Sequence, residues 1–182
     1  MSYLPPIVQG LLFAIVVVSA IFDLRERRVP NWVSFTGLAL AIALNTFLYE
    51  TPGLWLSLKG FGIATLIYFP LFMLRGMGAG DVKLMMAVGA AAGWQNWLGI
   101  LFLTALFGGI SAIVMVAWRK RLRKTFENLA LIVLSLMHRQ APHEVSPMLA
   151  VKSDRALRLP HAVAIAFGTI GYLIAAAIWA PR

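Results

Sequence analysis

Long apolar runs fill most of this chain, and they restrict it to folds that are stable in a membrane. Hydrophobic residues make up 60% of its 182 residues and charged residues only 13%, whereas a typical soluble domain is about half apolar and about a quarter charged. An α-helix needs about 20 apolar residues to cross the roughly 30 Å hydrocarbon layer of a bilayer. We therefore predict an all-α, polytopic membrane protein that forms one domain over residues 1–182.

The apolar runs predict six transmembrane helices. The longest run, residues 84–118, would extend about 52 Å as one helix, which is too long for a single crossing. We divide it at Gly93-Trp94-Gln95-Asn96, which provides a turn near its middle. The fourth span is then short, and a re-entrant segment is the alternative for it. The other predicted spans cover about residues 4–22, 32–49, 54–74 and 161–180.

The basic residues indicate how these spans are oriented. With six spans, the connections after the first, third and fifth span share one side, and they hold all 16 Lys and Arg residues except Lys59 and Arg182. Because Lys and Arg accumulate in cytoplasmic loops, we expect this side to be cytoplasmic and both termini to lie outside. Without the fourth span, the most basic connection would lie opposite the first one. The charge distribution therefore favours six spans.

The connection between the fifth and the last span contains a further apolar run, residues 126–137, that is too short to cross the bilayer. Its apolar positions share one helical face, and basic residues lie nearby. The positions on this face are Leu122, Phe126, Leu129, Val133 and Leu136. This pattern predicts an amphipathic helix that lies on anionic lipid in the membrane interface.

Composition excludes several classes of function. The chain contains no cysteine, which excludes disulfides, thiolate metal sites and cysteine nucleophiles. Its three histidines have no recognisable ligand spacing, and we expect no metal and no cofactor. The net charge of +9 comes with no basic patch interleaved with aromatic residues, so we expect no nucleic-acid binding. Five tryptophans near span ends predict an aromatic belt: Trp32, Trp94, Trp97, Trp118 and Trp179.

Two aspartates stand at span boundaries on the predicted cytoplasmic side. Asp23 ends the first span, and Asp81 precedes the fourth within the segment Gly78-Ala79-Gly80-Asp81. A carboxylate is costly to keep at a membrane helix, so each is a candidate functional residue. Taken separately, Asp81 is equally well explained as a helix N-cap, and Asp23 as the ion-pair partner of a nearby arginine. Their matching membrane depth favours a shared role, because adjacent helices would bring them together.

A pair of close carboxylates can hydrolyse an amide bond. The two cannot both ionise comfortably, so one keeps its proton and the pair contains a general base and a general acid. The base takes a proton from water as that water attacks the amide carbonyl, and the acid hydrogen-bonds to the carbonyl oxygen. Gly78 and Gly80 allow backbone conformations and close contacts that other residues prevent.

Two segments resemble the active-site motifs of bacterial type IV prepilin peptidases. Residues 23–31, Asp-Leu-Arg-Glu-Arg-Arg-Val-Pro-Asn, resemble the first motif, and residues 78–84, Gly-Ala-Gly-Asp-Val-Lys-Leu, resemble the second. The resemblance implies that Asp23 and Asp81 are the catalytic pair. It also implies that Pro30 and Asn31 begin the second span and fix the geometry behind Asp23. Lys83 matches a basic position after the second motif, where it contacts a substrate acid or extends to the membrane interface.

The resemblance implies an aspartic endopeptidase of the bacterial cytoplasmic (inner) membrane that removes the basic leader from prepilins at the cytoplasmic face. Prepilin and membrane lipid would be its partners. The chain is similar to the short form found in tight-adherence (Flp-type) pilus systems, so methyltransferase activity is not expected. Two alternatives remain open: a presenilin-like protease of other membrane helices, and a non-enzymatic transporter or assembly subunit that uses its aspartates for ion pairing or proton coupling.

Overall fold

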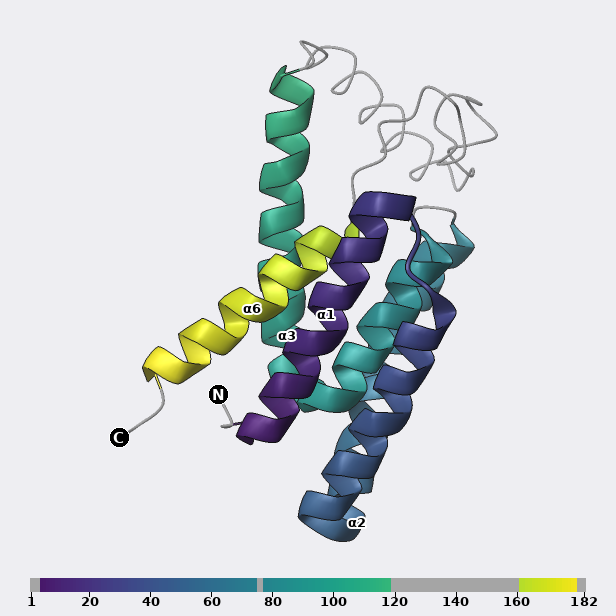
Figure 1. The fold of residues 1–182 in the computed structure, drawn as a ribbon, viewed down its shortest axis with the longest axis vertical. Helices are drawn as coiled ribbons and strands as arrows, with labels where there is room; N and C mark the ends of the chain where they lie inside the picture. The colour runs from purple at the N-terminus through teal and green to yellow at the C-terminus, as the bar shows by residue number, and fades with distance from the viewer. Residues whose placement is uncertain (1–3, 75–76, 119–160, 180–182) are drawn as a thin grey trace, which may run out of the picture.

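The computed structural model describes residues 4–74, 77–118 and 161–179, and the regular elements in these ranges are all α-helices. They are α1 (Pro6–Glu26), α2 (Asn31–Met73), α3 (Ala79–Trp118) and α6 (His161–Trp179), and they form one bundle (Figure 1). All 4 helices are long and apolar enough to cross a membrane. The predicted all-α membrane architecture is confirmed at this level. The predicted amphipathic helix at residues 126–137 lies outside the described residues.

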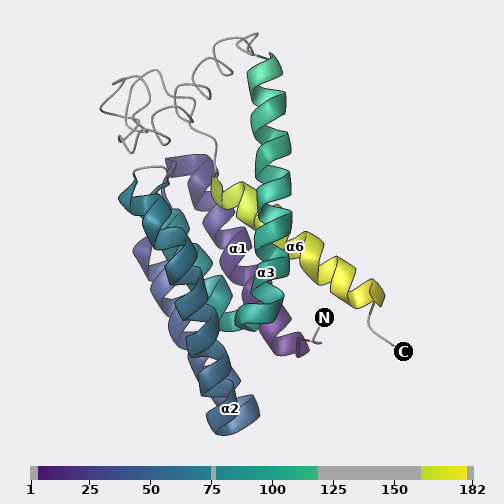
Figure 2. The same cartoon turned by 180° about the vertical axis from the view of Figure 1, so that it is seen from behind.

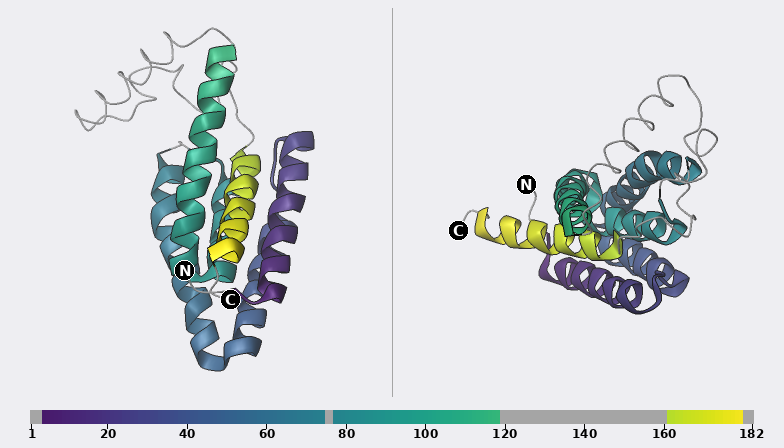
Figure 3. Two further views of the ribbon diagram at one scale, coloured as in Figure 1. Left: turned by 90° about the vertical axis from the view of Figure 1, so that its left-hand side faces the viewer. Right: turned by 90° about the horizontal axis from the view of Figure 1, so that it is seen from above.

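The helical backbone breaks once in α2 and once in α3. In α2 the break is at Glu50 (φ 53°, ψ −135°), two residues before Pro52. In α3 it is at Gly93 (φ 72°, ψ 160°), a conformation that glycine adopts more easily than other residues. The chain reverses at both points, so that each helix consists of two antiparallel halves (Figure 3). We call these the first and second halves of α2 (residues 31–49 and 51–73) and of α3 (residues 79–92 and 94–118).

Asn45 compensates for the break in α3. A helix that ends leaves its last backbone carbonyls without helical partners, and in an apolar environment these must be paired by other groups. The buried Asn45 Nδ2 donates to the carbonyl oxygens of Ala90 at 3.0 Å and Ala91 at 3.2 Å. It also donates to Ser57 Oγ at 2.9 Å. This one amide therefore connects both halves of α2 to the first half of α3.

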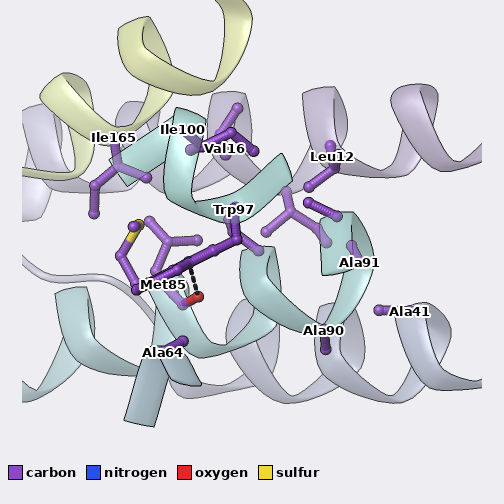
Figure 4. Close-up of a cluster of buried hydrophobic side chains, with 14 of the residues drawn as sticks. Leu12, Val16, Ala41, Ala64, Met85, Ala90, Ala91, Trp97, Ile100 and Ile165 are labelled. Atoms are coloured by element: carbon purple, nitrogen blue, oxygen red, sulfur yellow. Dashed lines mark hydrogen bonds between the residues drawn. The ribbon is translucent and has the colours of Figure 1, made fainter. Parts of the chain in front are cut away.

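The hydrophobic core contains buried side chains from all four described helices, α1, α2, α3 and α6. Leu12 and Val16 of α1, Ile100 of α3 and Ile165 of α6 are part of this core (Figure 4). Trp97 is fully buried at its centre. The second half of α2 packs against the first half of α3, where Gly60 is so close to Gly89 that a Cβ on Gly60 would overlap the Gly89 carbonyl.

The burial of Trp97 corrects one prediction. Trp97 was assigned to an aromatic belt, but its indole N–H donates to the Met85 carbonyl oxygen at 3.1 Å inside the core (Figure 4). Hydropathy places a residue at a depth in the membrane without showing which side of the helix faces inward, and Trp97 lies on the inner side. The other members of the predicted belt are exposed on the bundle surface: Trp32, Trp94, Trp118 and Trp179.

The two predicted motif segments lie at the same end of the bundle. The C-terminal end of α1, both ends of α2, and the N-terminal ends of α3 and α6 gather there (Figures 1 and 2). The N-terminal end of α1 and the C-terminal end of α6 lie toward the other end. Since α6 crosses α1 obliquely, its first turn comes close to the last turn of α1 (Figure 1).

Candidate functional site

Asp23 lies in the last turn of α1, with its side chain held by α6. The helix ends because Arg27 adopts the left-handed conformation (φ 55°) and its N–H bonds back to the Asp23 carbonyl at 3.0 Å. The Asp23 side chain is only 7% exposed, and its Oδ2 accepts a 3.0 Å hydrogen bond from the backbone N–H of Ala162. The first N–H groups of a helix lack helical partners and carry partial positive charge. The start of α6 is therefore a suitable partner for this acidic side chain.

Asp81 lies in the first turn of α3 and folds back over the start of its own helix. The first backbone bond of that helix runs from the Val82 N–H to the Gly78 carbonyl at 3.3 Å. A Cβ on Gly78 would lie 3.2 Å from Asp81 Oδ2, closer than most side-chain contacts. Glycine at position 78 therefore leaves room for the Asp81 carboxylate.

The two aspartates lie at the same end of the bundle, near enough to interact electrostatically. Asp81 interacts electrostatically with Asp23, although the two residues come from different helices. Two carboxylates at interacting distance cannot both be ionised without a cost in free energy, so such a pair shares protons. The structure places Asp23 and Asp81 at the same end of the bundle, and their catalytic role stays a prediction.

The connection between α1 and α2 packs directly on the second motif. A Cβ on Gly80 would lie 3.1 Å from the Val29 Cβ and 3.5 Å from the Val29 backbone nitrogen. Pro30 immediately precedes α2 in an extended conformation (φ −63°, ψ 138°), and Asn31 is the first residue of the helix. The prediction that Pro30 and Asn31 begin the second helix is confirmed. Gly80 permits the close approach of the chain segment that follows Asp23.

Lys83 connects the two motif segments. Its Nζ donates a 3.0 Å hydrogen bond to Asn31 Oδ1 and lies 5.5 Å from the centre of the Phe35 ring, within the range of a cation–π interaction. The sequence predicted that Lys83 contacts a substrate acid or extends to the membrane interface. Its bond to Asn31 was not predicted, and it joins the N-terminal turns of α2 and α3.

Two further side chains border the aspartates, and neither was predicted from the sequence. Tyr68, near the end of α2, is buried, interacts electrostatically with Asp81, and contacts the Trp97 ring edge-on at 6.0 Å between centroids. His161, the first residue of α6, interacts electrostatically with Asp23. Tyr68 lies inside an apolar run and carries no motif. The sequence feature that could have identified His161 is its position at the predicted cytoplasmic start of the last span, at the same membrane depth as both aspartates.

Metal-ligating side chains are not grouped at this site. In the described ranges, no three His, Asp or Glu residues are placed to hold a metal ion together. The polar groups described around the two aspartates include the Tyr68 phenol, the His161 imidazole and the Arg27 guanidinium, which form hydrogen bonds or carry charge.

The chain is similar in sequence to a known protein family and to a curated protein. A sequence model described as the type IV leader peptidase family matches residues 10–113, which include both aspartates. A prepilin leader peptidase/N-methyltransferase of Escherichia coli (strain K12) is 30% identical over 126 residues, which cover 64% of this chain and 56% of that protein. The chain thus spans little more than half the length of this curated relative. No solved structure matches the chain.

Proposed function

Because this chain belongs to the type IV leader peptidase family, we propose that it is an aspartic endopeptidase that removes the leader peptide from prepilins. The observation that carries this proposal is that Asp23 and Asp81, from different helices, lie at the same end of the bundle and interact electrostatically. The matched Escherichia coli protein is named a prepilin leader peptidase/N-methyltransferase. For this chain we propose the peptidase activity alone.

In the proposed reaction the two aspartates act as one acid–base unit. The ionised carboxylate takes a proton from water while the water oxygen bonds to the scissile carbonyl carbon. The protonated carboxyl donates a hydrogen bond to the carbonyl oxygen, where negative charge develops. The carbon–nitrogen bond then breaks, and the leaving amine takes a proton from the pair. One water is consumed for each peptide bond, and the pair returns to its starting protonation.

The neighbouring residues would keep the two carboxyls in place. The Ala162 N–H holds Asp23, and Gly78 leaves space for the Asp81 carboxylate. Gly80 lets the two motif segments pack together, and Lys83 joins them through Asn31. Acid–base catalysis depends on such positioning, because small displacements of a reacting group cost rate.

We also propose the membrane arrangement of the enzyme. The halves of α2 and α3 would act as separate crossings, which makes six with α1 and α6, and both termini would lie outside. The breaks at Glu50 and Gly93 support this count. The helix ends that gather around the aspartates adjoin the most basic connections of the chain. The site would therefore open at the cytoplasmic face of the bacterial inner membrane, in a single domain over residues 1–182.

Coexpression with a Flp-type prepilin tests the proposed function. The parent protein should shorten the prepilin, and mass spectrometry of the product should show loss of the leader. Asp23→Asn and Asp81→Asn should each abolish this cleavage at an unchanged level of protein in the membrane. Glu26→Gln is the matched control, because Glu26 is an exposed acid in the same last turn of α1 as Asp23. Normal processing by either aspartate variant would refute the proposal.

A further inference from the structure

The surroundings of the two aspartates differ in how well they stabilise a negative charge. A carboxyl pair catalyses hydrolysis only when one member is ionised and the other keeps its proton. Which member is ionised decides which one activates water and which one assists the carbonyl oxygen. The contacts of the Asp23 and Asp81 side chains distinguish the two.

The start of α6 stabilises the carboxylate form of Asp23. Asp23 Oδ2 accepts the 3.0 Å hydrogen bond from the Ala162 N–H, and Ala162 lies in the first turn of α6, which begins at His161. The N–H groups of a first helical turn carry partial positive charge, so a hydrogen bond from one of them favours an ionised acceptor. Because Asp23 is buried, its carboxylate needs such a partner to stay charged.

Two basic side chains also act on Asp23. Arg27, which follows the last residue of α1, and His161 on α6 both interact electrostatically with Asp23. A positive charge near a carboxylate favours its ionised form. Asp23 is therefore held by a backbone N–H of one helix and lies near basic groups from two chain segments.

Asp81 has different neighbours. The groups described as interacting electrostatically with it are the Asp23 carboxylate and the Tyr68 phenol, and neither is a cation. The charge on Asp23 opposes a second negative charge on Asp81. Asp81 also lies in a first helical turn, that of α3, but the Val82 N–H in this turn is bonded to the Gly78 carbonyl. Asp81 is thus the member whose surroundings favour the protonated form.

On the basis of the proposed function, we propose that Asp23 is the ionised general base, that Asp81 is the protonated general acid, and that the start of α6, with the Ala162 N–H and His161, fixes this order. Asp23 then takes a proton from water as the water oxygen bonds to the scissile carbonyl carbon, and Asp81 gives its proton to the carbonyl oxygen. As the carbon–nitrogen bond breaks, the proton on Asp23 passes to the leaving amine. A hydroxyl proton of the intermediate returns to Asp81, so the pair ends as it began.

Carbodiimide labelling tests the assignment without requiring any cleavage. Dicyclohexylcarbodiimide enters apolar surroundings and adds to carboxyls that carry a proton, and mass spectrometry of the digested protein identifies the labelled residue. At neutral pH, Asp81 should be labelled and Asp23 should not. Absence of label on Asp81, or label on Asp23 at an equal or higher rate, would overturn the assignment.

Replacement of Asp23 separates protonation of Asp81 from its accessibility. In Asp23→Asn the charge that opposes ionisation of Asp81 is lost while the side-chain shape is kept, so labelling of Asp81 should slow about threefold. Glu26→Gln is the matched control, because it removes an exposed carboxylate from the same last turn of α1 and should leave the labelling unchanged. Equal labelling of Asp81 in the two variants would overturn the proposal. A protein that does not cleave prepilins gives the same labelling, so this result is separate from the proposed function.

The pH dependence of prepilin cleavage tests the contribution of His161. Activity falls at low pH when the base gains a proton and at high pH when the acid loses one. Because His161→Gln removes a basic group that interacts with Asp23, the acidic limb should move to higher pH, with a rate about threefold lower at the parent's acidic midpoint. The basic limb should stay in place. Val163→Ala, an uncharged change in the same turn of α6, should leave both limbs unmoved. An unmoved acidic limb or a displaced basic limb in His161→Gln would overturn the assignment.

Discussion

Replacement of Lys83 by methionine should slow leader removal by loosening the contact between the two motif segments. Methionine keeps most of the side-chain length but loses the charge, the hydrogen bond to Asn31 and the contact with the Phe35 ring. Among the described residues, the Lys83 ammonium donates its hydrogen bond to Asn31 and not to an aspartate, so its effect would be exerted through the position of the helix that carries Asp81. It is therefore a positioning residue in our proposal.

The contacts of Lys83 set the size of the expected effect. Its hydrogen bond to Asn31 is exposed, so we take about 1 kcal/mol, below the usual range for charged groups. A cation–π contact at an exposed site adds about 0.5 kcal/mol. About 1.4 kcal/mol corresponds to a factor of ten in rate, so Lys83→Met should lower kcat about tenfold if this energy serves to align the carboxyls.

Steady-state cleavage of a synthetic prepilin peptide by purified protein in lipid nanodiscs would measure this effect. A double-mutant cycle of Lys83→Met, Asn31→Ala and the double variant isolates the contribution of the Lys83–Asn31 hydrogen bond. The activation free energies from kcat should show a coupling of about 1 kcal/mol between the two positions. Lys83→Arg should recover part of the rate. We expect kcat to fall with KM little changed. A rise in KM alone would show that Lys83 binds a substrate acid, and additive losses in the cycle would show that the bond to Asn31 is not used.

Three other predictions concern packing. Gly60→Ala should destabilise the protein by about 1–3 kcal/mol in thermal unfolding, because its Cβ would overlap the α3 backbone. Gly62→Ala, whose Cβ would meet nothing within 4 Å, should be neutral or stabilising. Equal effects of the two substitutions would contradict the close packing of α2 on α3. Asn45→Ala should lower the free energy of unfolding by about 2 kcal/mol, at about 0.6 kcal/mol for each of its hydrogen bonds. Thr36→Ala loses hydrogen bonds only within its own helix, so it should leave the free energy of unfolding nearly unchanged. Gly80→Ala should lower kcat about tenfold by displacing the α1–α2 connection, and unchanged activity would show that this contact does not position Asp23.

Hydropathy and local residue chemistry were sufficient to predict the elements of this fold. The apolar runs placed the helices, and the excess length of residues 84–118 required a reversal that the structure has at Gly93. The other break, at Glu50, lies in the gap between the predicted spans 32–49 and 54–74. Charge distribution put Asp23 and Asp81 at one end. These features depend on neighbouring residues in the chain or on depth in the membrane, both of which can be read from the sequence.

The contacts between helices could not be predicted in this way. The bond from the Ala162 N–H to Asp23 joins residues 139 positions apart, and it depends on the angle at which α6 crosses α1. Trp97 was misplaced because depth does not reveal which side of a helix faces the core. Tyr68 and His161 were missed for the same reason, since each becomes notable only through the aspartate that it faces.

One measurement tests most directly whether the two carboxyls work as a pair. It compares the rates at which purified Asp23→Asn, Asp81→Asn and the double variant cleave one prepilin peptide. Residues that act as a unit show strongly non-additive losses. We predict that each single variant cleaves no faster than the double variant, with all three folded as judged by thermal unfolding. Substantial cleavage by either single variant, or losses that multiply in the double variant, would contradict the proposed pair.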